Sequence, residues 1–362
     1  MLRHAMRRRG PALSAAGLID RAAAAGVLPG AVLAAGRGGA EQLLLHVTGD
    51  AQRDAAAIRP MAADTVFDLA SLTKVVATLP AVLYLAGRRE IGLDSPARRY
   101  LPGFAGPGKD QVTVRQLLLH TSGLPGQRRY DERARDAAEA RAAALAEPLV
   151  ARPGTMVCYS DVGFIALGEL AAAVARCGLG ELVQDVVCSP LGMTTTRFLP
   201  PATWAGRIAA TESVCGTARL GVVHDENAAV LGGVAGHAGL FGTAADLGRY
   251  AAAWAGDGSP PDGLRAEALR CQTEGLGGRR GLGWGLRGDA WDNMGDGWPA
   301  SGAGHTGFVG TSLSVDPRSG LWAVLLTNAV HFGRRSGPAN PVVGLRKQVH
   351  AAVATALLGR AT

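Results

Sequence analysis

The stretch VFDLASLTKVVATLPAVLYL, residues 66–85, places the strongest constraint on how this chain folds. It leads into a helical run whose apolar side chains leave no polar face: Val75, Val76, Leu79, Val82, Leu83 and Leu85. A helix that is apolar on nearly every side is buried at the centre of a protein. Proline removes a backbone donor, so Pro80 predicts a kink. The sequence therefore predicts a kinked central helix around which the other elements pack.

Ser71 and Lys74 stand where this helix begins. Residues three apart on a helix share a face, so the hydroxyl and the amine can meet as a nucleophile and its activator. A lysine in apolar surroundings can lose its proton near neutral pH and then act as a base. An isolated SxxK pattern is also compatible with a capping serine and a solvated lysine. The apolar helix that follows favours the catalytic interpretation.

Composition excludes several classes of function. The 362 residues carry a net charge of +7, but the arginines are scattered and aromatic residues make up only 5%, which does not favour nucleic-acid binding. No apolar run reaches the ~18 residues that a membrane span needs. No standard signal peptide is visible, so we expect a cytoplasmic protein. The five cysteines lack any CxxC pair and predict reduced thiols.

Strand-like segments lie at both ends of the chain. Residues 30–50 and 304–330 each predict an antiparallel hairpin, and residues 341–358 predict a closing amphipathic helix. Between them lie helices and loops, including a helix over residues 131–146 and a helix that begins at Thr243 with a capping box to Asp246. The Gly-rich segment 275–285 predicts a mobile loop or a boundary between units. We predict an α/β (α+β) fold in which residues 13–90 and 282–362 form an antiparallel sheet domain flanked by helices. Residues 91–281 form an inserted all-α domain, and residues 1–12 a basic tail.

Three short patterns follow one another along the chain: Ser71-x-x-Lys74, Tyr159-Ser160-Asp161 and His305-Thr306-Gly307. In this order the chain resembles the serine beta-lactamase and penicillin-binding-protein superfamily, in its class C-like branch with the family VIII esterases. Further stretches carry the resemblance: VTVRQLLLHTSGLP, PGTMVCYSDVGFIALGE, GVVHDENAAVLGGVAGHAGLFGTAADL and GHTGFVGTSLSVDP. The resemblance implies the beta-lactamase/transpeptidase-like fold.

The resemblance also implies roles for individual residues. Ser71 would form an acyl-enzyme, while Lys74 and Tyr159 would share the proton that passes from Ser71 to the leaving group. A free phenol titrates near pH ~10, so a phenolate base needs a nearby cation. The oxyanion hole would consist of the backbone N–H groups of Ser71 and Phe308.

Thr306 would help to place the substrate, and Gly307 would let its strand approach the substrate closely.

Two positions depart from the pattern of the family. Asp161 stands where class C beta-lactamases carry Asn, and it adds negative charge and cannot donate unless it is protonated. His305 stands where relatives that bind a carboxylate usually carry Lys, and imidazole is mostly neutral at pH 7. Both departures favour small esters or neutral amides as the acyl substrate. Alternatives that remain open are a transacylase, a penicillin-binding D,D-peptidase or beta-lactamase, and a binding homologue without activity.

The remaining histidines do not form a pattern that indicates catalysis or metal binding. His224-Asp225-Glu226 and His237 lack HExxH or any two-histidine helical spacing, so we expect no metal and no cofactor. His120 follows a predicted helix, where we expect it to bond free carbonyls. No GxSxG elbow is present, which disfavours an alpha/beta-hydrolase. The sequence does not indicate an oligomeric state.

Overall fold

The computed structural model describes residues 14–39, 42–214, 217–256, 258, 262–335 and 340–359. The predicted basic tail, residues 1–12, and Cys215 lie outside them. Cys158, Cys177, Cys188 and Cys271 are free thiols, as predicted.

A seven-stranded antiparallel sheet joins the two ends of the chain, in the order β3-β2-β1-β12-β11-β10-β9. The predicted hairpins are present: β1 pairs with β2, and β11 pairs with β12. The N-terminal β1 also pairs with the C-terminal β12, with Ala31 opposite Thr327. The strands are β1 Gly30–Arg37, β2 Gln42–Arg53, β3 Ile58–Pro60, β9 Gly285–Leu286, β10 Ala303–Thr306, β11 Ser312–Asp316 and β12 Leu321–Thr327.

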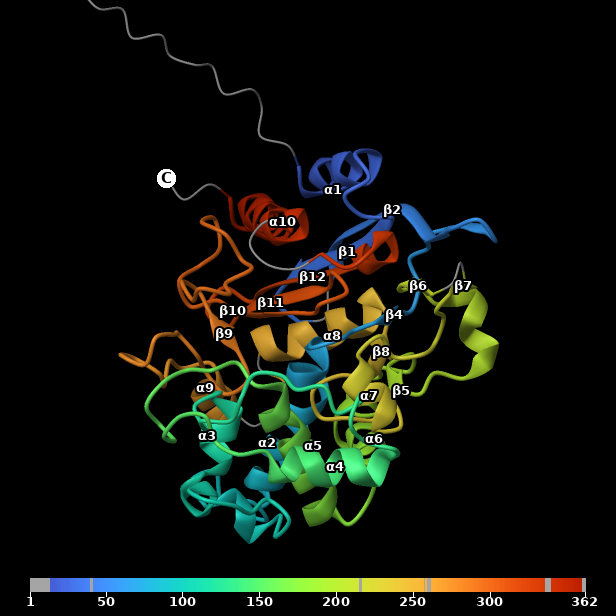
Figure 1. Ribbon diagram of the computed structural model, residues 1–362. Coiled ribbons are helices and arrows are strands. Elements are labelled where there is room, and N and C mark those ends of the chain that lie inside the picture. The colour runs from blue at the N-terminus through green and yellow to red at the C-terminus, as the bar shows by residue number, and fades with distance from the viewer. Residues whose placement is uncertain are drawn as a thin grey trace, which may run out of the picture.

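Helices bury both faces of this sheet (Figure 1). On one face, α1 (Ala15–Ala24) and α10 (Pro341–Leu358) pack against alternate residues of β1 such as Leu33. On the other face, α8 (Ala244–Ala255) packs against β1, β11 and β12. Successive side chains of a strand point to opposite faces, so burial on both sides explains why β12, LWAVLLT, is apolar throughout.

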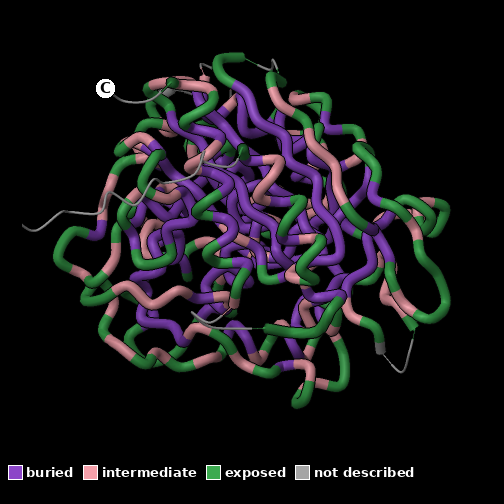
Figure 2. The backbone as a smooth tube through the Cα atoms, turned by 90° about the horizontal axis from the view of Figure 1, so that it is seen from above, coloured by how far each residue is buried: buried purple, intermediate pink, exposed green. Residues whose placement is uncertain are grey.

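The predicted central helix lies below the sheet among the other helices (Figure 1). It starts as a π-helical segment, η1 (Lys74–Thr78), and continues as α2 (Leu79–Gly87). The irregularity thus lies just before Pro80, at a single π-helical stretch of the kind often found at functional sites. α5 (Asp161–Ala175) packs against both parts, and Figure 2 shows the buried backbone gathered in the middle of the molecule.

Two local predictions need correction. The helix predicted over residues 131–146 begins only at Ala137 as α4 (Ala137–Ala146), because the Asp136 side chain accepts the Glu139 N–H and caps it. Thr243 caps α8 by accepting the Asp246 N–H, but the Asp246 carboxylate turns to the Thr195 N–H instead of completing a capping box.

The remaining elements are short. They are the helices α3 Val114–Leu118, α6 Leu179–Val183, α7 Glu226–Val230 and α9 Asp262–Ala268, the strands β4 Phe67–Asp68, β5 Arg197–Phe198, β6 Ser213–Val214, β7 Thr217–Ala218 and β8 Leu240–Gly242, the 3₁₀ helices η2 Ala97–Arg99, η3 Lys109–Gln111, η5 Ala202–Arg207 and η6 Ala329–Phe332, and the π-helical η4 Gln184–Cys188.

Within the described ranges, no single helix has the length and apolar character that a membrane span requires. One pair of helices, Asp161–Ala175 with Leu179–Cys188, meets the length and composition test together, but it is bent by 82°.

The central packing gives a prediction about Gly236, whose backbone lies against α5. A Cβ atom there would lie 2.0 Å from the carbonyl oxygen of Phe164. Because backbone must move to accept it, Gly236→Ala should lower the free energy of unfolding by at least about 2 kcal/mol.

Gly344→Ala is the matched control. Gly344 lies in α10, and a Cβ atom added there would meet nothing within 4 Å beyond the backbone of its own helix. This change should therefore stabilise the helix by about 0.5–1 kcal/mol. Denaturant unfolding measures both, and equal stability of the Gly236→Ala and wild-type proteins would contradict the packing described.

Candidate active site

Ser71 follows a strained residue at the end of a short strand. β4 brings the chain to Ala70, which takes φ +46°, a left-handed conformation that L-residues seldom adopt. The chain then turns into η1, so Ser71 stands in the turn before Lys74. The Lys74 ammonium donates to the Ser71 hydroxyl at 2.9 Å. The structure therefore brings the predicted nucleophile and activator into direct contact.

Lys74 is fully buried and has two further partners. Its Nζ lies 2.7 Å from Oδ1 of Asp161 and 3.1 Å from the His237 carbonyl oxygen, to which it donates. Burial alone lowers the pKa of Lys74, but the charge of Asp161 and the interaction with Tyr159 outweigh burial and raise that pKa above its usual value. The raised pKa favours the ammonium form of Lys74 at neutral pH, which does not favour Lys74 itself as the base that takes the Ser71 proton.

Tyr159 lies over the same ammonium. Its ring centroid is 5.0 Å from Nζ of Lys74, and its charge, when it is ionised, favours the ammonium form of Lys74. The Arg280 guanidinium lies 6.0 Å from the same ring, and the exposed Trp291 indole stacks on it at 6.4 Å. Ser71, Lys74 and Tyr159 thus form one contiguous cluster between η1 and the start of α5.

His120 supports Tyr159 rather than a helix end. Its Nδ1 accepts the backbone N–H of Ser160 at 3.0 Å, and its ring lies 4.6 Å from the Tyr159 ring. The prediction that His120 bonds carbonyls is wrong, because Nδ1 accepts an N–H and Nε2 has no hydrogen-bond partner among the described residues. Burial, together with the charges of Arg280 and Lys74, holds the pKa of His120 well below its usual value.

His305 is a neutral acceptor at the end of β10. Its Nδ1 lies 2.9 Å from the Thr306 carbonyl oxygen, which can only accept, so Nδ1 carries the proton. Burial, then the charges of Lys74 and Arg280, holds the pKa of His305 well below its usual value. The remaining nitrogen, Nε2, is buried without a hydrogen-bond partner among the described residues. A cationic lysine would donate at this position, whereas this imidazole can only accept.

Gly307 lies against the turn that carries Ser71. A Cβ atom on Gly307 would lie 2.6 Å from the Leu69 carbonyl oxygen and 2.2 Å from Oγ1 of Thr311, so only glycine fits. The Thr311 hydroxyl donates to the same Leu69 carbonyl at 3.2 Å. The segment from Gly307 to Phe308 is therefore pressed against the residues that precede Ser71, as an oxyanion hole shared between them requires.

Several residues at the site lie outside the three sequence motifs. Arg280 lies in the segment predicted to be a mobile loop or a boundary, but it is buried and pairs with Asp289 at 3.1 Å. Asp289 also accepts the backbone N–H of Trp291 and so holds that indole beside the site. No motif signals these contacts, because they depend on tertiary pairing across a loop. Asp68, three residues before Ser71, is also buried and accepts the Ala70 N–H, a bond to the residue two positions on that aspartate commonly makes in turns.

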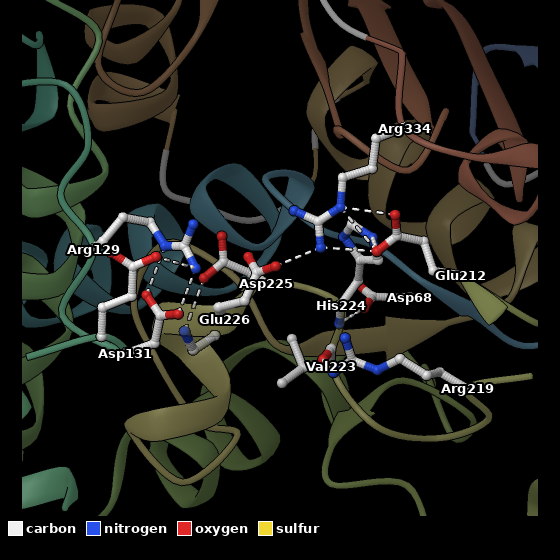
Figure 3. A network of polar contacts seen from close by, with 12 residues as sticks. Asp68, Arg129, Asp131, Glu212, Arg219, Val223, His224, Asp225, Glu226 and Arg334 are labelled. Carbon is white, nitrogen blue, oxygen red and sulfur yellow. Dashed lines mark hydrogen bonds and ion pairs between the residues drawn. The ribbon is translucent and has the colours of Figure 1, made fainter. Parts of the chain in front are cut away.

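The histidines singled out by sequence have protein partners. Nε2 of His224 lies 3.0 Å from Oε2 of Glu212, and Nε2 of His237 lies 2.9 Å from Oδ1 of Asp225. Figure 3 shows His224 within a network of carboxylates and arginines. In the part of the chain that the structure describes, no group of three or more His, Cys, Asp or Glu side chains is placed to hold a metal ion.

Comparison with known proteins identifies the family. The family model described as beta-lactamase matches residues 15–346. A putative D-alanyl-D-alanine carboxypeptidase of Escherichia coli (strain K12) is 32% identical over 313 residues, which cover 76% of this chain and 72% of that protein.

Solved structures share the fold. One is EstCE1, a hydrolase with promiscuous acyltransferase activity, with a TM-score of 0.73 and 23% sequence identity. The alignment covers 93% of this chain and 97% of the EstCE1 chain. Another is a class C beta-lactamase from Rhodobacter sphaeroides, with a TM-score of 0.74 and 20% sequence identity. The alignment covers 95% of this chain and 99% of the beta-lactamase chain. At these identities the likeness concerns the fold alone.

The Lys74–Asp161 pair predicts a specific pH dependence. Asp161→Asn removes the negative charge that raises the pKa of Lys74, so that pKa should fall. If activity requires the Lys74–Tyr159 pair to release a proton, the alkaline rise of kcat/KM should move to lower pH by about one unit or more.

Ester turnover measured from pH 6 to 11 tests this, with Asp110→Asn, which removes one charge from an exposed position, as the control. An unshifted profile for Asp161→Asn would show that the carboxylate does not govern this proton.

Proposed function

The chain belongs to the beta-lactamase family and is a serine hydrolase, and from that premise we propose that it cleaves small esters or neutral amides through an acyl-enzyme on Ser71. The observation that carries the proposal is the contact of 2.9 Å between the buried Lys74 ammonium and the Ser71 hydroxyl, with Tyr159 on the same ammonium. Apolar residues of similar volume often stabilise a protein as well as a buried ion pair does, so stability alone does not explain a buried lysine here.

The proton has a defined route in this proposal. Ser71 Oγ attacks the carbonyl carbon and loses its proton to the phenolate of Tyr159, which becomes a phenol, because the Lys74 ammonium has no lone pair to accept that proton. Tyr159 then passes the proton to the leaving group as the carbon–heteroatom bond breaks. Lys74 keeps its own proton and favours negative charge on Tyr159 throughout. Water, activated by the same oxygen, releases the acyl group and regenerates Ser71.

The charges around the site favour neutral substrates. Asp161 balances the charge of Lys74, and neutral His305 offers an acceptor where a cation would be needed to attract a carboxylate. Trp291 and Phe308 are exposed aromatic side chains on the two segments that flank the cluster. Exposed aromatic rings of this kind bind apolar groups. We therefore expect apolar acyl or leaving groups.

Two alternatives use the same acyl-enzyme. The relative from Escherichia coli carries the name of a putative D-alanyl-D-alanine carboxypeptidase, whose substrates would end in a carboxylate. EstCE1 is described as a hydrolase with promiscuous acyltransferase activity, in which an acceptor other than water takes the acyl group. The local charges disfavour the first alternative, whereas they leave acyl transfer open.

Loss of the Tyr159 hydroxyl should disable the proton route. Tyr159→Phe should lower kcat for p-nitrophenyl acetate and butyrate by at least ~100-fold, since removal of an acid–base group commonly costs this much. Tyr84→Phe is the matched control, because Tyr84 is exposed on α2 and should leave kcat unchanged. Equal turnover by the Tyr159→Phe and wild-type enzymes would remove the proposed role.

The substrate class can be decided with the same wild-type enzyme. Short esters should turn over faster than a peptide that ends in D-Ala-D-Ala, and product analysis with and without an added alcohol or amine shows where the acyl group goes. Preferential cleavage of the peptide would favour the carboxypeptidase, and an acylated acceptor as the main product would favour the transacylase.

A further inference from the structure

Asp68 connects two segments that meet at Ser71. It is the last residue of β4, its side chain is 2% exposed, and each carboxylate oxygen accepts one backbone N–H. Oδ1 accepts from Ala70 at 2.7 Å, and Oδ2 accepts from His224 at 2.7 Å. Figure 3 shows Asp68 beside His224 in the surrounding polar network. One buried carboxylate thus joins the turn before Ser71 to the loop at residues 223–225.

The bond to Ala70 acts on a strained residue. Ala70 takes φ +46°, which an alanine holds only when its surroundings impose it. Its N–H is fixed by Asp68, and its carbonyl oxygen accepts the Thr73 hydroxyl at 2.7 Å. The next backbone N–H along the chain is that of Ser71, one of the two donors expected in the oxyanion hole. The orientation of that N–H therefore depends on the conformation that Asp68 helps to impose.

The bond to His224 acts on the other side of the site. The His224 ring stacks on the Phe308 ring, with centroids 5.8 Å apart and an angle of 22° between the planes. The same ring contacts Glu212 through Nε2, and Glu212 is paired with Arg334 at 2.8 Å. His224 is thereby fixed at its backbone by Asp68 and at its ring by Glu212. Phe308, which carries the second expected oxyanion donor, rests on this fixed ring.

We propose that Asp68 is the positioning residue that holds both halves of the oxyanion hole, the Ser71 N–H through Ala70 and the Phe308 N–H through His224. The inference rests on the proposed acyl-enzyme function. It predicts that Asp68 affects the transition state more than the bound substrate, because an oxyanion hole stabilises charge that develops only during the reaction.

Asp68→Asn tests the proposal, because one side of an amide cannot accept an N–H. We expect kcat for p-nitrophenyl butyrate to fall by about 10- to 100-fold with little change in KM, the size of effect that misplaced catalytic groups produce. The affinity for phenylboronic acid, which forms a tetrahedral anionic adduct with an active-site serine, should fall by a similar factor.

Asp246→Asn is the matched control. Asp246 is also a buried aspartate that accepts a backbone N–H, from Thr195 at 2.8 Å, and burial raises the pKa of both carboxyl groups. It lies at the start of α8, and the partners of its carboxylate, Thr195, Thr196 and Arg249, are not residues of the site. We expect Asp246→Asn to lower stability while kcat and boronate affinity stay at wild-type values, which separates positioning from general destabilisation.

Rescue provides a second readout. Glycine adopts positive φ without strain, so Asp68→Asn with Ala70→Gly should regain part of the lost kcat. If Asp68→Asn does not fold, His224→Ala tests the proposal instead. This variant keeps the backbone bond to Asp68 but removes the ring that stacks on Phe308. It should lower both kcat and the affinity for phenylboronic acid.

Three results would overturn the proposal: equal kinetic effects of Asp68→Asn and Asp246→Asn, a change confined to KM, or wild-type kinetics for His224→Ala. Failure of the proposed function itself is recognised separately, since the wild-type enzyme would then bind no phenylboronic acid at Ser71 and turn over no ester.

Discussion

The ion pair between Lys74 and Asp161 is the interaction on which the rest of the site depends. A lone ammonium buried at the start of the central helix would cost several kcal/mol, and removing one partner of such a pair commonly costs about 3–5 kcal/mol. Here Nζ of Lys74 contacts Asp161, the Ser71 hydroxyl and the His237 carbonyl oxygen. These partners come from three segments, so satisfying one charge fixes the relative positions of η1, the start of α5 and the loop at His237.

In the proposed mechanism, in which the Tyr159 phenolate takes the Ser71 proton, the same ion pair also determines the chemistry. An amide at position 161 would leave the Lys74 charge unbalanced, whereas the carboxylate raises the pKa of Lys74 and keeps it protonated. Tyr159 is then the group with a lone pair available for the Ser71 proton. Neutral His305 completes the pattern, because its imidazole cannot replace the lysine that relatives use to attract a carboxylate. Both departures from the family pattern thus support the proposal that the substrates are uncharged.

Much of the fold and the composition of the site could be predicted from sequence, because both depend on local patterns. The apolar stretch after Ser71, the hairpins and the three motifs need no tertiary information, and α10 occupies the residues predicted for it. The predicted start of α4 is wrong because the helix begins where the Asp136 side chain caps it. The predicted role of His120 is wrong because its Nδ1 accepts the Ser160 N–H. The protonation of Lys74, the strain at Ala70 and the position of Arg280 depend on distances between remote segments, which no local pattern contains.

The most direct test of the account is intact-protein mass spectrometry after exposure to a fluorophosphonate, followed by peptide mapping, with Ser71→Ala and Ser189→Ala alongside. Ser189 is exposed in the helical region and serves as the control for non-specific reaction. We predict one adduct for each chain, located on Ser71, which is retained in Ser189→Ala and absent from Ser71→Ala. An adduct that persists in Ser71→Ala, or a wild-type protein that forms none, would contradict the claim that Ser71 is the nucleophile.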